Sequence, residues 1–129
     1  MNKHHLNSNL AKAKDLGSTH EGTDHFIHQR LTALALIPLV LWFCFAIAML
    51  PNMDYEILIH WVKNPINSVL LIVTLMVSFY HLQIGLQVII EDYIAGYFLK
   101  LTSLIAMKFF CIFLSITGVF AVLKISLGS

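Results

Sequence analysis

Charged residues are scarce in this sequence: they make up 12% of its 129 residues, whereas 58% of the residues are hydrophobic. A soluble domain of this length could not hide so much apolar surface, so the composition disfavours a water-soluble protein. A soluble bundle of unusually apolar helices is the minor alternative. The formal net charge of +1 comes without a basic patch, so nothing indicates binding to nucleic acid.

Cysteine is also scarce, since the sequence contains only Cys44 and Cys111. They form neither a C-x-x-C nor a C-x-x-C-H motif, so covalent haem attachment and a zinc knuckle are both unsupported. Each lies inside an apolar run and is interpreted as a buried thiol that serves as a small hydrophobic side chain.

The first 24 residues lack the apolar segment of a cleaved secretory signal. This polar tail, residues 1–24, is expected to be loosely ordered unless a partner holds it. The histidines in and just after the tail fit no metal-ligand spacing: His4, His5, His20, His25 and His28. Only His25 and His28, one helical turn apart beside the first apolar run, are kept as candidates.

Long apolar runs are what the sequence has in abundance. They cover residues 31–50, 66–90 and 104–123, and each is about long enough to cross a hydrocarbon core of ~30 Å. The sequence therefore predicts an all-α integral membrane protein. Three transmembrane helices, at about residues 30–50, 66–90 and 104–123, form one anchor domain, residues 25–126.

Local signals refine this plan at the start of the chain. Thr23 or Asp24 is expected to cap the first helix, and Pro38 is expected to bend it. The connection at residues 51–65 predicts a short helix in the membrane interface, with Tyr55 and Trp61 at headgroup level.

Polar and small residues inside the other two spans predict helix contacts. Gln83 and Gln87 would be costly against lipid, so the second helix should contact protein or cofactor on more than one side. In a chain of three helices this indicates a partner subunit. In the third span, Lys108 lies one to two turns in, and Ser115 and Gly118 form a small-residue patch suited to close packing.

Lysine and arginine set the predicted orientation. The N-terminal side of the membrane would carry the larger group, which is Lys3, Lys12, Lys14, Arg30 and Lys100, against Lys63 and Lys124 on the other side. The positive-inside rule therefore places the N-terminus and residues 91–100 in the cytoplasm. Arg30, Asp92 and Tyr93 then reach one level at the cytoplasmic side.

His81 is the one histidine deep inside an apolar run, roughly 16 Å from Asp92 along a helix. An ionisable side chain at that depth is a functional-site hypothesis by default. It could ligate haem iron, relay protons or form a hydrogen bond with another helix, and the residues alone leave these uses open. Gly85 shares its face, one turn away, and leaves room for a flat group.

The cytoplasmic end of the second span offers a different chemistry. A Tyr beside an Asp, with an Arg at the same level, suits a polar headgroup that has two carbonyl oxygens. Tyr93 can donate to one oxygen, Asp92 can relay a proton, and Arg30 supplies positive potential for a developing anion. An ordinary helix end with an interfacial aromatic residue is the simpler alternative.

The segment His81-x-x-x-Gly85-x-x-x-x-x-x-Asp92-Tyr93 resembles the signature of the D-subunit membrane anchor of succinate dehydrogenase, a succinate:quinone oxidoreductase also called complex II. Residues 25–33, with the sequence His-Phe-Ile-His-Gln-Arg-Leu-Thr-Ala, resemble the start of that family's first helix. The three-helix plan and the length agree, so the resemblance covers nearly the whole chain.

The resemblance implies a role for each candidate residue. His81 would be an axial ligand of the iron of haem b, shared with the C subunit. Tyr93 would hydrogen-bond ubiquinone, the substrate, and Asp92 beside it would act in proton delivery or site structure. Arg30 would lie near the haem propionates and the quinone pocket, and His28 would approach a propionate.

The resemblance also implies partners and a location. The chain would be half of a heterodimeric anchor bundle with the C subunit, docking the iron–sulfur and flavoprotein subunits at the bacterial inner membrane. Electrons from succinate would reduce quinone there, within electron transport and the tricarboxylic acid cycle. FAD, the clusters and the succinate site would belong to other subunits, and this chain has neither a dinucleotide glycine fingerprint nor a cysteine cluster.

Two other functions are weighed against this one. The chain could be a haem-free structural anchor in which His81 only packs or forms a hydrogen bond. It could also be a small transport subunit with His81 in a proton path, although one deep ionisable residue, rather than a series, disfavours transport.

The predicted orientation can be tested by cysteine labelling in intact cells. A cysteine placed near residue 10 should be shielded from a membrane-impermeant thiol reagent, because the N-terminal side is expected to be cytoplasmic. A cysteine placed within residues 52–64 should be labelled. The reverse pattern would overturn the topology, and with it the placement of the quinone site.

Overall fold

The computed structural model describes residues 17–128, with side chains from residue 23 onward. Four helices follow one another: α2 (Gly17–Ala48), α3 (Tyr55–Lys63), α4 (Pro65–Tyr93) and α5 (Tyr97–Leu127). This part of the chain contains no strand, so the all-α prediction is confirmed. The predictions for the histidines of the tail before residue 17, and for the side chain of His20, fall outside the described residues.

Three of these helices are long and apolar enough to cross a membrane: Thr23–Ala48 within α2, Pro65–Tyr93 and Tyr97–Leu127. The three predicted spans are therefore confirmed, although α4 and α5 extend beyond both predicted ends and α2 begins earlier and ends at Ala48, two residues before the predicted end. Helix continues past an apolar run because adding a residue to an existing helix fixes few dihedrals for each new hydrogen bond.

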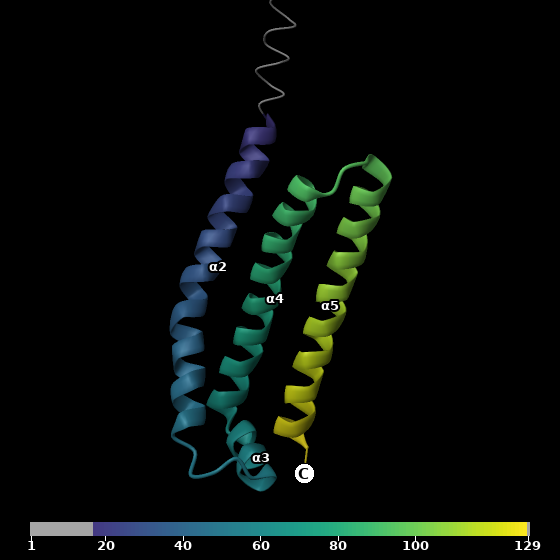
Figure 1. The fold of residues 1–129 in the computed structure, drawn as a ribbon. Helices are drawn as coiled ribbons and strands as arrows, with labels where there is room; N and C mark the ends of the chain where they lie inside the picture. The colour runs from purple at the N-terminus through teal and green to yellow at the C-terminus, as the bar shows by residue number, and fades with distance from the viewer. Residues whose placement is uncertain (1–16, 129) are drawn as a thin grey trace, which may run out of the picture.

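Two predictions about where helices begin are wrong, because each helix starts before its apolar run. The first helix begins at Gly17, so Thr23 and Asp24 lie inside it and neither is its N-cap. The third helix begins at Tyr97, so Lys108 lies about three turns from its start rather than one to two. Pro38 lies within α2 without ending the helix, and the ribbon changes direction part-way along its length (Figure 1).

α4 is the central helix of the structure. It packs against α2 on one side and α5 on the other, and no backbone contact joins α2 to α5 in the described part of the chain (Figure 1). The three long helices thus form an open layer rather than a closed bundle. The start of α2 lies at the same end as the last turn of α4 and the first turn of α5, and α3 lies at the opposite end.

Short sequence signals produce the two turns that flank α4. Asn64 caps the helix by accepting a 3.0 Å hydrogen bond from the Ile66 amide, and Pro65 occupies the first turn, where no amide hydrogen is needed. After Tyr93 the chain turns through Gly96, whose φ of +94° lies in a region that side chains with a Cβ rarely adopt.

The predicted helix between residues 51 and 65 is present as α3. The indole of Trp61 stacks on Trp42 of α2 with ring centroids 5.9 Å apart, and its place at headgroup level stays a prediction. Phe43 meets the same indole edge-on at 6.4 Å. Aromatic pairs of this kind stabilise by about 0.5–1.5 kcal/mol beyond burial, so they hold α3 against the end of α2.

The small-residue patch on α5 lies where α4 packs, as predicted. A methyl group added at Gly118 would lie 3.2 Å from Leu75 Cδ1 of α4, so the glycine permits the close approach of the two helices. Cys111 is buried in this same contact and behaves as the predicted small hydrophobic residue. Cys44 is exposed on α2, so that half of the cysteine prediction is wrong.

Very little of the apolar surface is buried by the chain itself. Ile84 and Cys111 are the only hydrophobic side chains described as buried, at 4% and 3% exposure. The remaining apolar faces need lipid or another protein to cover them, which agrees with the predicted membrane location and partner.

The contact between α4 and α5 predicts the effect of filling Gly118. Gly118→Phe should force the helices apart and destabilise the folded assembly by roughly 1–3 kcal/mol, the usual cost of overpacking. The purified complex in mild detergent should then show a lower thermal denaturation midpoint. Ala106→Phe, on an exposed face of α5, is the matched control. Equal midpoints for the two variants would contradict this packing.

Candidate functional site

His81 lies half-buried on α4 and meets α2 through a side chain that the sequence did not indicate. Its Nδ1 atom is 2.9 Å from the hydroxyl oxygen of Thr32. One turn along α4, the space beside Gly85 is bordered by the Gln29 side chain, 3.8 Å from where a Cβ would stand. The room predicted opposite Gly85 is therefore taken in part by α2.

A groove at the edge of the contact between α2 and α4 reaches His81. Two hollows, of about 380 and 420 Å³, both include Ala33 and His81 in their walls. The first is also lined by Phe26, Gln29 and Arg30, and the second by Leu36, Ile37, Val40 and Leu41. Ala33 contributes only a methyl group, so the imidazole is accessible through the gap that this small side chain leaves.

The two parts of this groove differ in polarity. The part toward the start of α2 holds the side-chain amide of Gln29 and the guanidinium of Arg30. This guanidinium lies 5.0 Å above the ring of Phe26. The part toward the middle of the span is entirely apolar apart from His81. Such a groove suits a flat ligand with an apolar body and anionic groups at one edge, because each end of the ligand finds a matching environment.

His28 lies outside this groove. Along α2 it is two residues, or about 200°, from Arg30, so it points to the other flank of the contact with α4. There its Nδ1 atom is 3.2 Å from the hydroxyl of Tyr80, with ring centroids 6.2 Å apart. His25, the other candidate kept near the membrane, is exposed.

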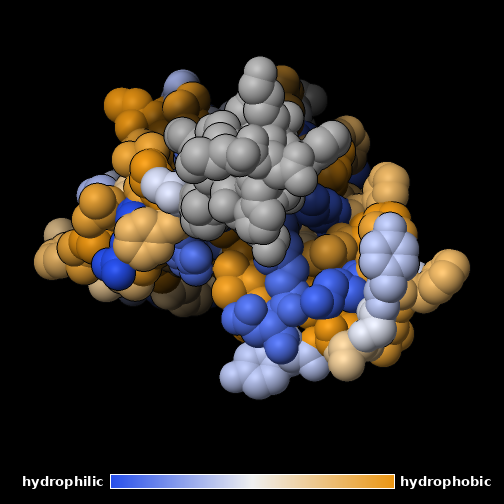
Figure 2. Space-filling model, turned by 90° about the horizontal axis from the view of Figure 1, so that it is seen from above, coloured by the Kyte–Doolittle hydropathy of each residue, from blue (hydrophilic) through white to orange (hydrophobic). Residues whose placement is uncertain are grey.

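Asp92 and Tyr93 form the last turn of α4 and are exposed, Tyr93 to 84%. The end of the molecule where α4 ends is the one seen in Figure 2, and hydrophilic surface lies there between hydrophobic flanks. Neither Asp92 nor Tyr93 lines the hollow that Arg30 shares with His81. These two residues are therefore free to contact a ligand or another subunit.

The depth of Arg30 differs from the sequence expectation. α2 and α4 run antiparallel, with Thr32 opposite His81 and Gln29 opposite Gly85. This register places Arg30 about nine residues, or roughly 13 Å, deeper than Tyr93 along the helix axes. Arg30, Asp92 and Tyr93 share one end of the molecule but not one level, and Arg30 groups with His81 instead.

The two glutamines of α4 have different surroundings. Gln87 donates a 2.9 Å hydrogen bond to Glu91 on the next turn of its own helix, so it does not by itself require a partner. Gln83 lines a hollow of about 300 Å³ between α4 and α5, beside Cys111 and Ser115. The partner inferred from these glutamines thus rests more firmly on the exposed apolar faces.

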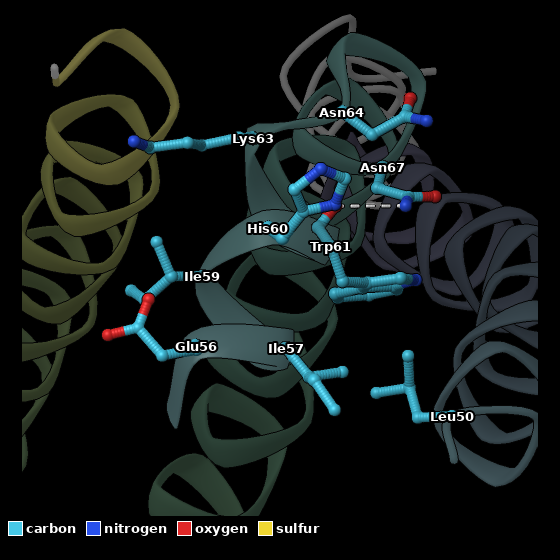
Figure 3. Close-up of a pocket in the computed structure, with 9 residues that line it drawn as sticks. All are labelled: Leu50, Glu56, Ile57, Ile59, His60, Trp61, Lys63, Asn64 and Asn67. Carbon is cyan, nitrogen blue, oxygen red and sulfur yellow. Dashed lines mark hydrogen bonds between the residues drawn. The ribbon is translucent and has the colours of Figure 1, made fainter. Parts of the chain in front are cut away.

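A wider hollow, of about 760 Å³, lies at the opposite end, beside α3 (Figure 3). Trp61 forms one wall, and its carbonyl oxygen accepts a 3.0 Å hydrogen bond from Asn67. The imidazole of His60 belongs to this wall and is exposed, as expected for a solvated side chain. None of the predicted site residues lines this hollow, so the groove beside His81 is the stronger candidate.

The residues missed from the sequence include Thr32 and Ala33 at the groove, and Tyr80, which meets His28 outside it. Ala33 and Arg30 are three residues apart on one helix face, which was a usable signal for the groove. No local signal could join Thr32 to His81 or His28 to Tyr80, because these pairs are 49 and 52 residues apart.

Comparison with known proteins gives consistent matches over most of the chain. Residues 4–123 match the family of succinate dehydrogenase/fumarate reductase transmembrane subunits. A succinate dehydrogenase hydrophobic membrane anchor subunit of Rickettsia bellii is 38% identical over 88% of this chain and 90% of its own. The subunit of the same name from Rickettsia prowazekii is 34% identical over the same shares.

A more distant relative is the succinate dehydrogenase hydrophobic membrane anchor subunit of Paracoccus denitrificans. It is 30% identical over 65% of this chain and 65% of its own length. No solved structure gives a significant match.

Proposed function

The chain belongs to the family of succinate dehydrogenase/fumarate reductase transmembrane subunits, and from that premise we propose that it anchors a succinate dehydrogenase in the membrane. We further propose that it contributes to a haem b site through His81 and to a ubiquinone site through Tyr93 and Asp92. The anchor role is supported by the names of the relatives and by three apolar helices long enough to span.

The observation that carries the haem proposal is the groove at His81. The Nδ1 atom is engaged by Thr32, while the described residues give Nε2 no hydrogen-bond partner. Neutral imidazole ligates iron through one ring nitrogen while the other is held by a second group, so the arrangement fits an axial ligand. The groove's apolar part and the guanidinium of Arg30 fit a porphyrin and its propionates.

Each residue has a distinct task in this proposal. His81 would ligate the iron, Arg30 would neutralise the propionates, and Ala33 would leave space for the macrocycle. Haem b, when bound, supplies one-electron redox chemistry. A propionate contact for His28 stays a prediction, and the position of its ring on the other flank does not favour it.

In this proposal the other ligand of the iron would come from another polypeptide. Among the described residues no cluster of three or more His, Cys, Asp or Glu side chains could hold a metal, and His81 is the histidine at mid-span. The uncovered apolar faces leave room for the other anchor subunit. The proposed complex also includes iron–sulfur and flavoprotein subunits, at the bacterial inner membrane with the N-terminus in the cytoplasm.

One observation favours a second candidate, the haem-free anchor. The 2.9 Å contact between Thr32 and His81 would by itself link α2 to α4, whether or not haem is bound. A proton path receives no comparable support, because the described part of the spans offers His81 no chain of ionisable neighbours.

The haem proposal predicts the consequences of changing the groove. In the complete complex, His81→Leu should remove or shift the b-type absorption band of the reduced protein, while assembly partly survives. Ala33→Leu should weaken the band without touching the ligand, because the larger side chain fills the gap. Ala48→Leu, exposed at the far end of α2, is the matched control. An unchanged b-type spectrum in His81→Leu would show that His81 is not a haem ligand and only packs or forms a hydrogen bond.

The quinone proposal rests on the last turn of α4. Quinone reduction needs hydrogen-bond donors at the oxygens and a source of protons, while the isoprenoid tail needs an opening to the bilayer. The exposed phenol and carboxylate of Tyr93 and Asp92 at a helix end meet these needs. Because Arg30 lies deeper, the structure favours its role at the propionates over a direct contact with the quinone.

The quinone site can be tested with Tyr93→Phe, which removes only the hydroxyl. The complex should assemble, and succinate oxidation with a soluble dye should stay near the parental rate. Quinone reduction should fall by ~10- to 1000-fold, the scale of losing a positioned donor or proton-transfer group. Tyr97→Phe, on the first turn of α5, is the matched control. Parental quinone reduction in Tyr93→Phe would make Tyr93 an interfacial aromatic only.

A further inference from the structure

Thr32 is placed to control which nitrogen of His81 carries the proton. Its hydroxyl oxygen lies 2.8 Å from the His28 carbonyl oxygen and 3.1 Å from the Gln29 carbonyl oxygen, both on the preceding turn of α2. The same oxygen lies 2.9 Å from His81 Nδ1 on α4. Thr32 thus joins the backbone of one helix to the imidazole of the other.

Counting hydrogens decides the direction of these bonds. A threonine hydroxyl has one hydrogen to donate and two lone pairs that accept. A carbonyl oxygen can only accept, so the short contact with the carbonyls requires the hydroxyl to donate to them. If the hydroxyl donated to His81 instead, its oxygen would face a carbonyl oxygen at 2.8 Å with no hydrogen between them.

The hydroxyl must therefore accept a hydrogen from His81. Nδ1 then carries the hydrogen of the neutral ring, and Nε2 carries the lone pair. A nitrogen with a free lone pair is the form of imidazole that can bind a metal. A hydrogen bond donated by the other ring nitrogen also fixes the ring orientation and makes the ligand more basic.

We propose that Thr32 is the positioning residue for His81: by accepting a hydrogen bond from Nδ1, it presents Nε2 to haem iron. This inference rests on the proposed haem site. Thr32 does not touch the haem in this scheme and acts through the histidine. Losing its hydroxyl should weaken the electron donation of the imidazole, which favours ferrous over ferric iron and raises the reduction potential.

The test uses the complete complex with Thr32→Val, which keeps the branched shape and removes the hydroxyl. An optical redox titration should show the b-type midpoint potential shifted upward, and haem should pass to added apomyoglobin at a rate ~10- to 100-fold higher. Thr32→Ser should restore both values toward the parental complex. Thr32→Ala repeats the loss with a smaller side chain, so a Val variant that fails to assemble still leaves the hydroxyl tested.

Thr117→Val is the matched control, because Thr117 makes the same 2.8 Å bond to a carbonyl oxygen one turn back but meets no histidine. It should leave the potential unchanged. If the Thr32 variants keep the parental potential and rate of haem transfer while His81→Leu removes the band, the role of Thr32 is overturned and the haem ligand stands. A band that survives His81→Leu unchanged would overturn the proposed haem ligand itself.

Discussion

The contact between α2 and α4 is the interaction on which the candidate site depends. In hydrocarbon a polar side chain has no water to satisfy it, so a histidine at mid-span needs a group from a neighbouring helix. Thr32 supplies that group, and the bond fixes the register of the two antiparallel helices. The same register brings Arg30 and Ala33 to the edge of the imidazole, where the groove forms.

α4 could not hold this position without its second contact. Gly118 lets α5 approach to the point where an added methyl group would lie 3.2 Å from Leu75, and Cys111 is buried nearby. At the far end Ser126 donates a 3.2 Å hydrogen bond to the buried Ser68, which links the same two helices. α4 is thus held from both sides, while one edge of its contact with α2 stays open to a ligand.

An open layer of three helices is an incomplete membrane domain. Its helices leave apolar side chains exposed on α2, α4 and α5, and only two hydrophobic side chains are buried among residues 23–128. Lipid can cover part of this surface at no cost, but lipid cannot supply a second iron ligand or bind propionates. The proposed haem site therefore makes the partner subunit a chemical requirement as well as a packing partner.

The sequence by itself determined the membrane class, the three spans and the depth of His81, because hydropathy and residue counting depend only on order along the chain. It also indicated the close packing at Gly118. It placed the ends of the helices less well, since helix propagates through Thr23 and Asp24 once begun.

Only the tertiary structure decided which residues meet across helices. Thr32 and His81 are 49 residues apart, and their contact follows from how α2 and α4 turn about their axes. That rotation also turned His28 toward Tyr80. The axial register of the same two helices placed Arg30 deeper than Tyr93. A hydrophobic run fixes the length of a span but not the rotation of the helix about its axis. Every apolar face suits lipid equally well, so contacts with neighbouring helices determine that rotation.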